Sequence, residues 1–203
     1  MKVIERAAYR LPIEAHHVSD STGGVYAFRV NIPTNMMLGL SKDLQNTSKA
    51  KRSLLWHISR LAKALRRIYL TGEISSNQSP HIRRAFELSA TSKDFDAVEA
   101  LCADMISKQG DGPEALRTAA NIARYSFDLA PPIYVGMTAK QTFRQRLEQH
   151  LAGHTGLYGR MREAGLSWGD CCFEPHEMAV SKGAVDIAES LTQSILQPIF
   201  SVR

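Results

Sequence analysis

The sequence contains few cysteines and no long apolar segment. Its 203 residues include three cysteines, Cys102, Cys171 and Cys172. An odd number, with two adjacent in sequence, excludes a disulfide framework, and the absence of a CxxC pair argues against a zinc site. No apolar run approaches the roughly 18 residues that a membrane helix needs, and the N-terminus lacks the apolar centre of a signal peptide. We therefore expect a protein of the reducing cytoplasm with no membrane partner.

Internal repeats, low-complexity tracts and glycine-rich phosphate loops are also absent. The 44% of hydrophobic residues and 22% of charged residues exclude wholesale disorder. A chain of this length is expected to form a single domain spanning residues 1–203, with room for one sizeable insertion. His16 and His17 are adjacent in sequence and therefore point in different directions on any regular element, which argues against a metal site there.

Basic residues are concentrated in one segment of the chain. Residues 41–84 hold ten basic and two acidic side chains, a net charge of +8, whereas the charge over the whole chain is only +5. A segment of this charge is typical of a surface that binds a polyanion such as nucleic acid. An ordinary solvent-facing helix remains the alternative.

The apolar pattern predicts an α+β fold. Strands are predicted at 24–30, 133–136 and 171–178, with Pro175 indicating an edge or an irregularity in the third. Helices are predicted at 48–70, around 82–88, from 95 to about 110, at 113–127, at 142–151, within 154–166 and at 182–197. On the last of these, one buried arc is expected, with Glu189 at its edge and Asp186 on the open face. The expected arc consists of Ala184, Ile187, Ala188, Leu191 and Ile195.

Four short motifs follow one another along the chain. They are Gly24-Val25-Tyr26, Tyr134-Val135-Gly136, Arg146-x-x-x-His150, and Glu189 on the last predicted helix. Their order and spacing resemble the GIY-YIG nuclease family, and most closely its type II restriction endonucleases. The resemblance covers residues 131–200 and a few residues near 22–30. It implies a small antiparallel sheet flanked by helices, with residues 31–130 as a large helical insertion that contacts DNA.

The resemblance also implies a site and a reaction. The implied catalytic residues are Tyr26, Tyr134, Arg146, His150 and Glu189, with Gly24, Gly136 and Ser201 in support. Tyr26 is the implied general base, and Glu189 is the implied ligand of Mg²⁺, for which Mn²⁺ can substitute. The expected activity is hydrolysis of DNA phosphodiester bonds by a restriction or other defence nuclease. The implied partners are double-stranded DNA and a second copy of the chain in a homodimer.

Elementary chemistry agrees with these residue types. Arg146 and His150 lie four residues apart and share one face of a helix, where a guanidinium can hold a phosphate through its planar fork. A carboxylate at the rim of a core can bind a hard cation whose remaining ligands are water and phosphate oxygens. A tyrosine pKa lies near 10, so we expect a nearby cation and Arg146 to favour the phenolate form of Tyr26. Core tyrosines, a structural histidine and exposed helix charges are the alternatives at these positions.

Several positions depart from the family pattern. Tyr26 and Tyr134 are 108 residues apart, whereas compact family members carry both motifs on one hairpin. Met137 stands where many members have Lys or Arg, and Ser201 stands where many have Asn. The DNA contacts are assigned to the basic helix and to the helix of Arg146. They are Arg60, Lys63, Arg66, Arg67 and Arg144. A non-catalytic DNA-binding protein and a structure-selective repair nuclease remain the alternative functions.

Overall fold

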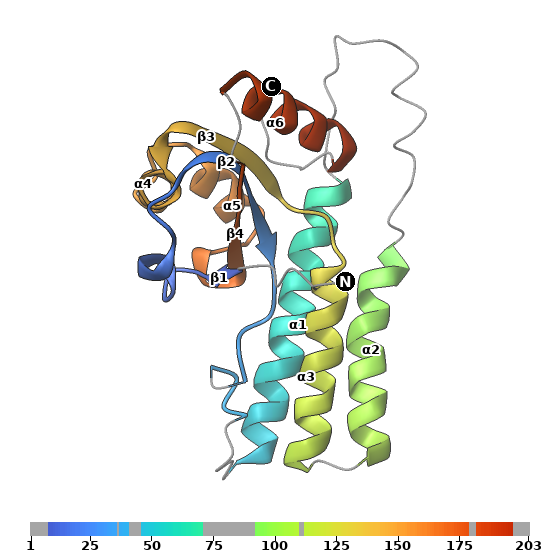
Figure 1. Ribbon diagram of the computed structural model, residues 1–203. Coiled ribbons are helices and arrows are strands. Elements are labelled where there is room, and N and C mark those ends of the chain that lie inside the picture. The colour runs from blue at the N-terminus through green and yellow to red at the C-terminus, as the bar shows by residue number, and fades with distance from the viewer. Residues whose placement is uncertain are drawn as a thin grey trace, which may run out of the picture. The chain divides into compact units, whose positions relative to one another are not determined.

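The computed structural model describes residues 8–35, 37–40, 46–70, 92–109, 112–178 and 182–196. Within these ranges the chain forms an antiparallel sheet and several helices, which confirms the predicted α+β class (Figure 1). The chain divides into two compact units. One contains Met1–Asn31 and Tyr125–Arg203, and the other is Ile32–Arg124. The second unit falls within the predicted insertion, residues 31–130.

The sheet of the first unit has four strands in the order β1-β4-β2-β3. The strands are β1 (Tyr9–Arg10), β2 (Thr22–Val30), β3 (Tyr134–Thr142) and β4 (Cys171–Glu177). All pairings are antiparallel, and β2 pairs with both β3 and β4. Thus the segments that carry the two tyrosine motifs are neighbouring strands, although the whole second unit separates them in sequence.

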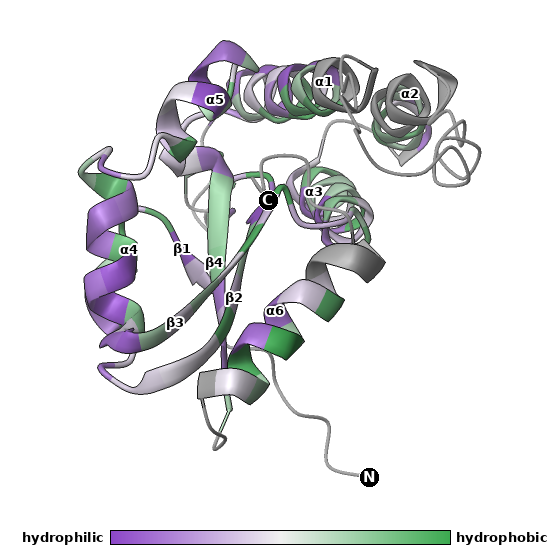
Figure 2. Ribbon diagram, turned by 90° about the horizontal axis from the view of Figure 1, so that it is seen from above, coloured by the Kyte–Doolittle hydropathy of each residue, from purple (hydrophilic) through white to green (hydrophobic). Residues whose placement is uncertain are grey.

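The two faces of β2 pack against different helices, because successive side chains of a strand point to opposite faces. Tyr26 and Phe28 lie on the face covered by α4 (Phe143–Leu151), whose Phe143 ring lies edge-on to Tyr26. Val25 and Ala27 lie on the other face, which packs against α6 (Lys182–Leu196). Figure 2 shows α4 and α6 on opposite sides of these strands.

The start of α4 is fixed by a capping box. The Thr142 hydroxyl accepts a hydrogen bond from the Gln145 backbone N–H at 3.1 Å, and the Gln145 side chain accepts one from the Thr142 N–H at 3.1 Å. These two bonds satisfy backbone donors that a helix start would otherwise leave without a partner. Phe143, Leu147 and His150 are then buried on one side of the helix. After α4 the chain forms α5 (Leu157–Glu163) and a 3-10 turn, η3 (Trp168–Asp170). Another 3-10 turn, η1 (Ala15–His17), precedes β2.

The buried side of α6 differs from the predicted arc. Val185 is buried and Ala188 packs against the cluster of Val25, Ala27 and Val135, whereas Ile187 and Leu191 are 69% and 57% exposed. The expectation for Ile187 and Leu191 is therefore wrong. The helix approaches the sheet through small side chains, and this turns the larger apolar ones outward. The same rotation leaves Asp186 half-buried, not open, and the side chain of Ile195 lies outside the described part.

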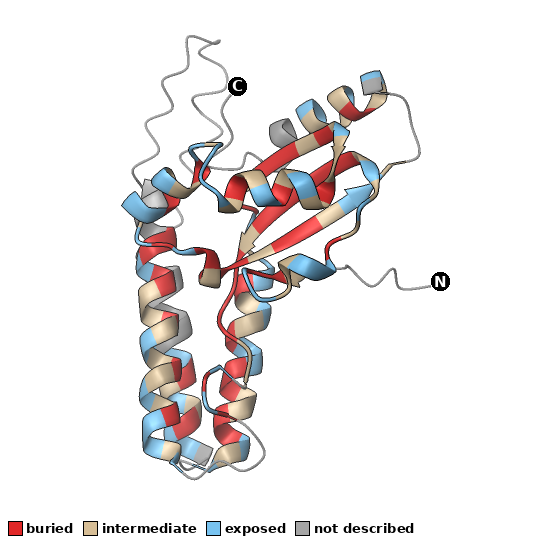
Figure 3. Ribbon diagram, turned by 90° about the vertical axis from the view of Figure 1, so that its left-hand side faces the viewer, coloured by how far each residue is buried: buried red, intermediate tan, exposed pale blue. Residues whose placement is uncertain are grey.

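The second unit contains α1 (Thr47–Leu70), α2 (Ser92–Gln109) and most of α3 (Pro113–Asp128). Its core draws on the predicted apolar stripe of α1 and on facing residues of α2 and α3. The core residues include Leu54, Ile58, Leu61, Leu65, Cys102, Ile106, Leu116, Ala119 and Ala123. The Cys102 thiol donates to the carbonyl of Ala119 at 3.7 Å, which joins α2 to α3. Figure 3 shows buried positions recurring along the long helices.

A polar clasp joins the two ends of the second unit. The Arg124 guanidinium, near the end of α3, donates to the Pro33 carbonyl at 3.0 Å and to Asn35 Oδ1 at 3.3 Å. The first and last residues of the unit therefore lie close together in space. In the first unit, Asn31 and Asp128 are joined by a 2.5 Å hydrogen bond just outside this boundary.

Most predicted elements are present within one or two residues, but three details differ. The predicted strand 133–136 extends to Thr142, and β1 was not predicted at all, because two residues carry no readable alternation. β4 is an interior strand, not an edge strand. Its neighbour β1 pairs only with Cys172 and Phe173, so Pro175 has a strand partner on one side alone. Proline cannot donate a ladder hydrogen bond, and it is tolerated at a position that has a strand partner on one side only. The predicted helix around 82–88 lies outside the described residues.

Within the described residues, no helix combines the length and the apolar character that crossing a membrane requires.

Candidate active site

Tyr26 lies at the centre of the candidate site and is completely buried. Its cross-strand partner on β3 is Gly136. A Cβ at position 136 would lie 2.5 Å from Tyr26 Oη and 2.8 Å from the Tyr134 ring. Glycine at this position therefore makes room for the phenol between the strands.

The hydroxyl of Tyr26 has polar partners on α4. Arg146 Nε donates to Tyr26 Oη at 3.1 Å, and His150 Nε2 lies 2.8 Å from the same oxygen. The Tyr134 ring is 6.1 Å from that of Tyr26 and 5.3 Å from that of His150, measured between centroids. The fold thus brings together four of the five residues assigned from sequence, from two strands and one helix.

Arg146 is the half-exposed member of this group. One terminal nitrogen, Nη1, donates to Gln149 Oε1 at 2.9 Å on the same helix, while Nε holds Tyr26. These two bonds fix the plane of the guanidinium. The guanidinium also interacts with the side chain of Tyr134. Because Arg146 is half-exposed, an anion arriving from solvent can reach it.

His150 is completely buried and neutral at ordinary pH. Burial, and then the positive charges of Arg146 and Arg160, lower the pKa of His150 from 6.5 to about 3. The second ring nitrogen, Nδ1, lies 2.6 Å from Thr155 Oγ1 in the turn after α4. Both ring nitrogens are therefore hydrogen-bonded, as a buried imidazole requires.

Burial opposes the expected phenolate form of Tyr26. Burial, and then the neighbouring Tyr134, raise the pKa of Tyr26 well above its ordinary value, and the opposing effect of Arg146 is smaller. The free-energy cost of burying a phenolate exceeds the stabilisation that one adjacent guanidinium gives to it. Tyr26 is therefore a neutral phenol in this structure.

Glu189 is half-buried on α6, across the sheet from Tyr26. Burial and the nearby Asp186 raise its pKa, and Arg146 acts in the opposite direction. The guanidinium of α4 is thus close enough to act on the carboxylate of α6. Among the described residues, no group of three or more side chains of metal-binding type occurs. A cation at Glu189 would therefore have this carboxylate as its protein ligand, with water and phosphate oxygens as the others.

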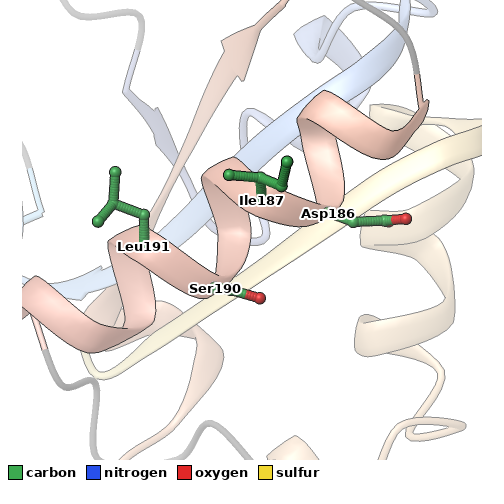
Figure 4. Close-up of a pocket in the computed structure, with 4 residues that line it drawn as sticks. All are labelled: Asp186, Ile187, Ser190 and Leu191. Carbon is green, nitrogen blue, oxygen red and sulfur yellow. The ribbon is translucent and has the colours of Figure 1, made fainter.

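The outer side of α6 carries a surface pocket that is separate from this group. The pocket has a volume of about 400 Å³ and is lined by Asp186, Ile187, Ser190 and Leu191. Figure 4 shows the two apolar side chains standing on the same side of the helix. Glu189 does not line it.

The remaining predicted positions have different surroundings. A Cβ at Gly24 would collide with the His176 carbonyl and lie 2.8 Å from the Phe143 ring, so Gly24 permits close packing of β2 at this point. Arg144 donates to the Val18 carbonyl at 2.9 Å and pairs with Asp20 at 3.2 Å. Its charge is therefore already engaged within the chain. Ser201 lies outside the described residues.

The predicted DNA-contacting side chains of α1 belong to the second unit. Lys63 is exposed, and the Arg60 guanidinium lies 5.0 Å from the ring centroid of Trp56, a side chain that is 58% exposed. The side chains of Arg66 and Arg67 lie outside the described part of the chain.

Sequence reasoning missed two residues of the site, Gln149 and Thr155. Gln149 follows Arg146 by three residues, a spacing at which side chains meet on a helix, so this contact could have been found. Thr155 lies in a turn, where no periodicity indicates which way a side chain points.

Comparison of the chain with protein-family models, with curated proteins and with solved structures finds no match. The family resemblance therefore rests on the motifs and their geometry alone.

We expect Gly136→Ala to lower the free energy of unfolding by about 1–3 kcal/mol, because the added methyl group overpacks the space of Tyr26. Gly159→Ala on α5 is the matched control, since a Cβ there meets nothing within 4 Å. Replacing a glycine within a helix by alanine should stabilise the control by up to about 1 kcal/mol. Urea unfolding followed by Trp168 fluorescence, in a Trp56→Phe background, makes the comparison. Equal stability of the two variants would contradict the close approach of the Tyr26 side chain to Gly136.

Acid should weaken the fold through His150. The unfolded histidine binds a proton below pH 6.5 and the folded one only near pH 3. The stability that the fold gains by keeping His150 neutral is therefore fully present above pH 6.5 and is lost as the pH falls toward 3. We expect His150→Gln to flatten the fall in unfolding free energy over this window by up to about 1.4 kcal/mol per pH unit. His154→Gln, at an exposed position, is the control and should retain the wild-type slope. An unchanged slope in His150→Gln would show that His150 is not buried in its neutral form.

Proposed function

We propose that this chain is a magnesium-dependent DNA endonuclease of the GIY-YIG type, acting as a restriction or other defence nuclease. The observation that carries the proposal is the cluster of Tyr26, Tyr134, Arg146 and His150. Their side chains come from motifs far apart in sequence and meet at one buried phenol. Such a cluster offers both a charge clamp and a proton acceptor, which hydrolysis of a phosphodiester requires.

Arg146 binds the scissile phosphate in this proposal. Its half-exposed guanidinium is held by Tyr26 and Gln149 in the unliganded structure, and its nitrogens can turn to a phosphate oxygen. Once turned onto the phosphate, the planar cation stabilises the charge that develops on phosphorus. Tyr134, half-buried beside the same group, orients the phosphate or the attacking water.

Tyr26 and His150 handle the proton. When the guanidinium turns toward a bound phosphate, its Nε leaves Tyr26 Oη and a water can take its place. As that water attacks phosphorus, its proton passes to Tyr26 while the phenol proton passes to His150 Nε2. The bound phosphate offsets the charge of Arg146, one of the groups that lower the pKa of His150, and so makes the imidazole a stronger base. The bond between phosphorus and the 3′ oxygen breaks, and the leaving oxygen takes a proton from solvent. By the family resemblance the ends are 3′ hydroxyl and 5′ phosphate.

Glu189 would hold the cation. Its raised pKa reflects burial and repulsion from Asp186, and a divalent cation relieves both effects. When bound, Mg²⁺ supplies Lewis-acid stabilisation of the leaving 3′ oxygen.

The basic helix α1 would bind the DNA backbone. Arg52 and Lys63 are exposed, and Arg60 stacks on the exposed ring of Trp56. Arginines and lysines on an exposed helix form phosphate contacts, and a stacked arginine keeps a defined orientation. Two copies of the chain related by a two-fold axis would match a palindromic site.

A non-catalytic DNA-binding protein is the second candidate. The observation that favours it is the complete burial of Tyr26, which keeps its hydroxyl away from water in the unliganded structure. Salt-sensitive DNA binding without magnesium-dependent cleavage would support this reading.

We expect the wild-type chain to cleave plasmid or phage DNA with Mg²⁺ and not with EDTA. Arg146→Lys should slow cleavage by about 10²–10³-fold, because lysine lacks the planar fork that clamps the phosphate. Glu189→Gln should abolish cleavage while DNA binding persists. Arg162→Lys and Glu163→Gln, at exposed positions on α5, are the matched controls. Full activity in Glu189→Gln would reject the metal assignment.

The basic helix can be tested separately from the chemistry. We expect Arg60→Glu combined with Lys63→Glu to weaken DNA binding and to reduce the slope of log affinity against log salt by about 2, since each phosphate contact contributes about 0.9. Lys108→Glu combined with Arg117→Glu, on α2 and α3, makes the same charge change elsewhere in the unit. Equal slopes for the two double variants would mean that α1 is no preferred DNA contact.

A further inference from the structure

The buried hydrogen bonds of the candidate site form a chain that ends at Thr155. The chain runs from Arg146 Nε to Tyr26 Oη at 3.1 Å, from Tyr26 Oη to His150 Nε2 at 2.8 Å, and from His150 Nδ1 to Thr155 Oγ1 at 2.6 Å. The resemblance and the motifs assign no role to Thr155. Its position at the end of the chain bears directly on where each proton sits.

The direction of the chain follows from its first member. A guanidinium has only donors, so Tyr26 Oη must accept the hydrogen bond from Arg146. The phenol keeps one proton to donate. Its side-chain neighbours that can accept it are Tyr134 and His150, and the bare imidazole nitrogen, 2.8 Å away, is the stronger acceptor. His150 carries a single proton when neutral, so a bare Nε2 places that proton on Nδ1. Thr155 Oγ1 then accepts it.

We propose that Thr155 is a positioning residue that fixes His150 as the Nδ1–H tautomer, so that Nε2 stays ready to accept the proton of Tyr26. The hydrogen bond made by one ring nitrogen decides the protonation of the other. A nucleophile or base is aligned in the same way wherever a third group orients the histidine beside it.

The local structure holds Thr155 in place for this role. α4 ends immediately after His150, where the Gly153 N–H donates to the His150 carbonyl at 3.0 Å and the His154 N–H to the Gln149 carbonyl at 3.0 Å. The chain thereby turns back beneath the end of the helix. Thr155 is half-buried there, beside the completely buried imidazole.

Without the Thr155 hydroxyl, Nδ1 would lose its acceptor within the turn. The imidazole proton could then move to Nε2, where it would point at Tyr26 Oη, an atom that already accepts from Arg146. Tyr26 could no longer donate to His150, and the proton path would be closed. The catalytic consequence rests on the proposed function, whereas the tautomer does not.

The direct test is the ¹⁵N spectrum of histidine-labelled protein without DNA at pH 7.5. The His150 signals are assigned by their loss in His150→Gln. We expect a protonated Nδ1 and a bare Nε2 in the wild type and in Thr155→Ser, which keeps the hydroxyl. Thr155→Val, of equal size, should shift the population toward Nε2–H. A wild-type His150 already protonated at Nε2 overturns the proposal, and so does an unchanged tautomer in folded Thr155→Val. Because the wild-type spectrum alone is decisive, poor folding of one variant leaves the test intact.

Cleavage kinetics provide the second arm. We expect Thr155→Val to lower kcat by roughly 10–100-fold, in the range of other groups that orient a functional histidine, with KM little changed. Thr155→Ser should restore kcat to near the wild-type value. Equal loss of kcat in both variants would reject the role of the hydroxyl. Failure of the wild type to cleave DNA would reject the proposed function, while the spectrum would still decide the tautomer.

Discussion

A single buried hydroxyl organises the first unit. Tyr26 Oη lies between a donor that cannot accept and an imidazole that can do either, in a space from which water is excluded. A buried polar group without partners costs about 1–3 kcal/mol, so this oxygen constrains the rotamers of both α4 side chains. The glycine across the strand is a condition of the arrangement, because any side chain there would occupy the position of the phenol. Strand pairing, helix orientation and side-chain protonation are thus coupled at one atom.

The sheet separates the two charges that a phosphodiester hydrolase would have to use together. Arg146 extends from the helix on one face and Glu189 from the helix on the other, yet the guanidinium affects the pKa of the carboxylate. β3 is the edge strand, and both α4 and α6 contact it, from opposite faces of the sheet.

The positions of the helices and strands in the sequence were more predictable than which face of each is buried. The repeat of Leu54, Ile58, Leu61 and Leu65 predicts the buried stripe of α1, because these apolar residues recur at three- and four-residue steps along one side of the helix. On α6, two apolar faces compete, and the choice of Val185 over Ile187 depends on the shape of the sheet beneath, which the sequence of the helix does not contain. The pairing of Tyr26 with Gly136 was accessible through the motifs. The contact of His150 with Thr155 was not, since it is made by a turn. The protonation of Tyr26 depends on its burial, which the sequence does not give.

The clasp between Arg124 and the Pro33–Asn35 segment has a kinetic consequence. β2 and β3 would have to find each other across about a hundred residues if the intervening chain were a random coil, and such distant contacts form slowly. Helical contacts within the intervening unit are more local and form early. Once Arg124 fastens its two ends, the search between the strands is reduced to that of a short hairpin. The order of assembly would then run from the middle of the polypeptide outward, with the sheet as its last step.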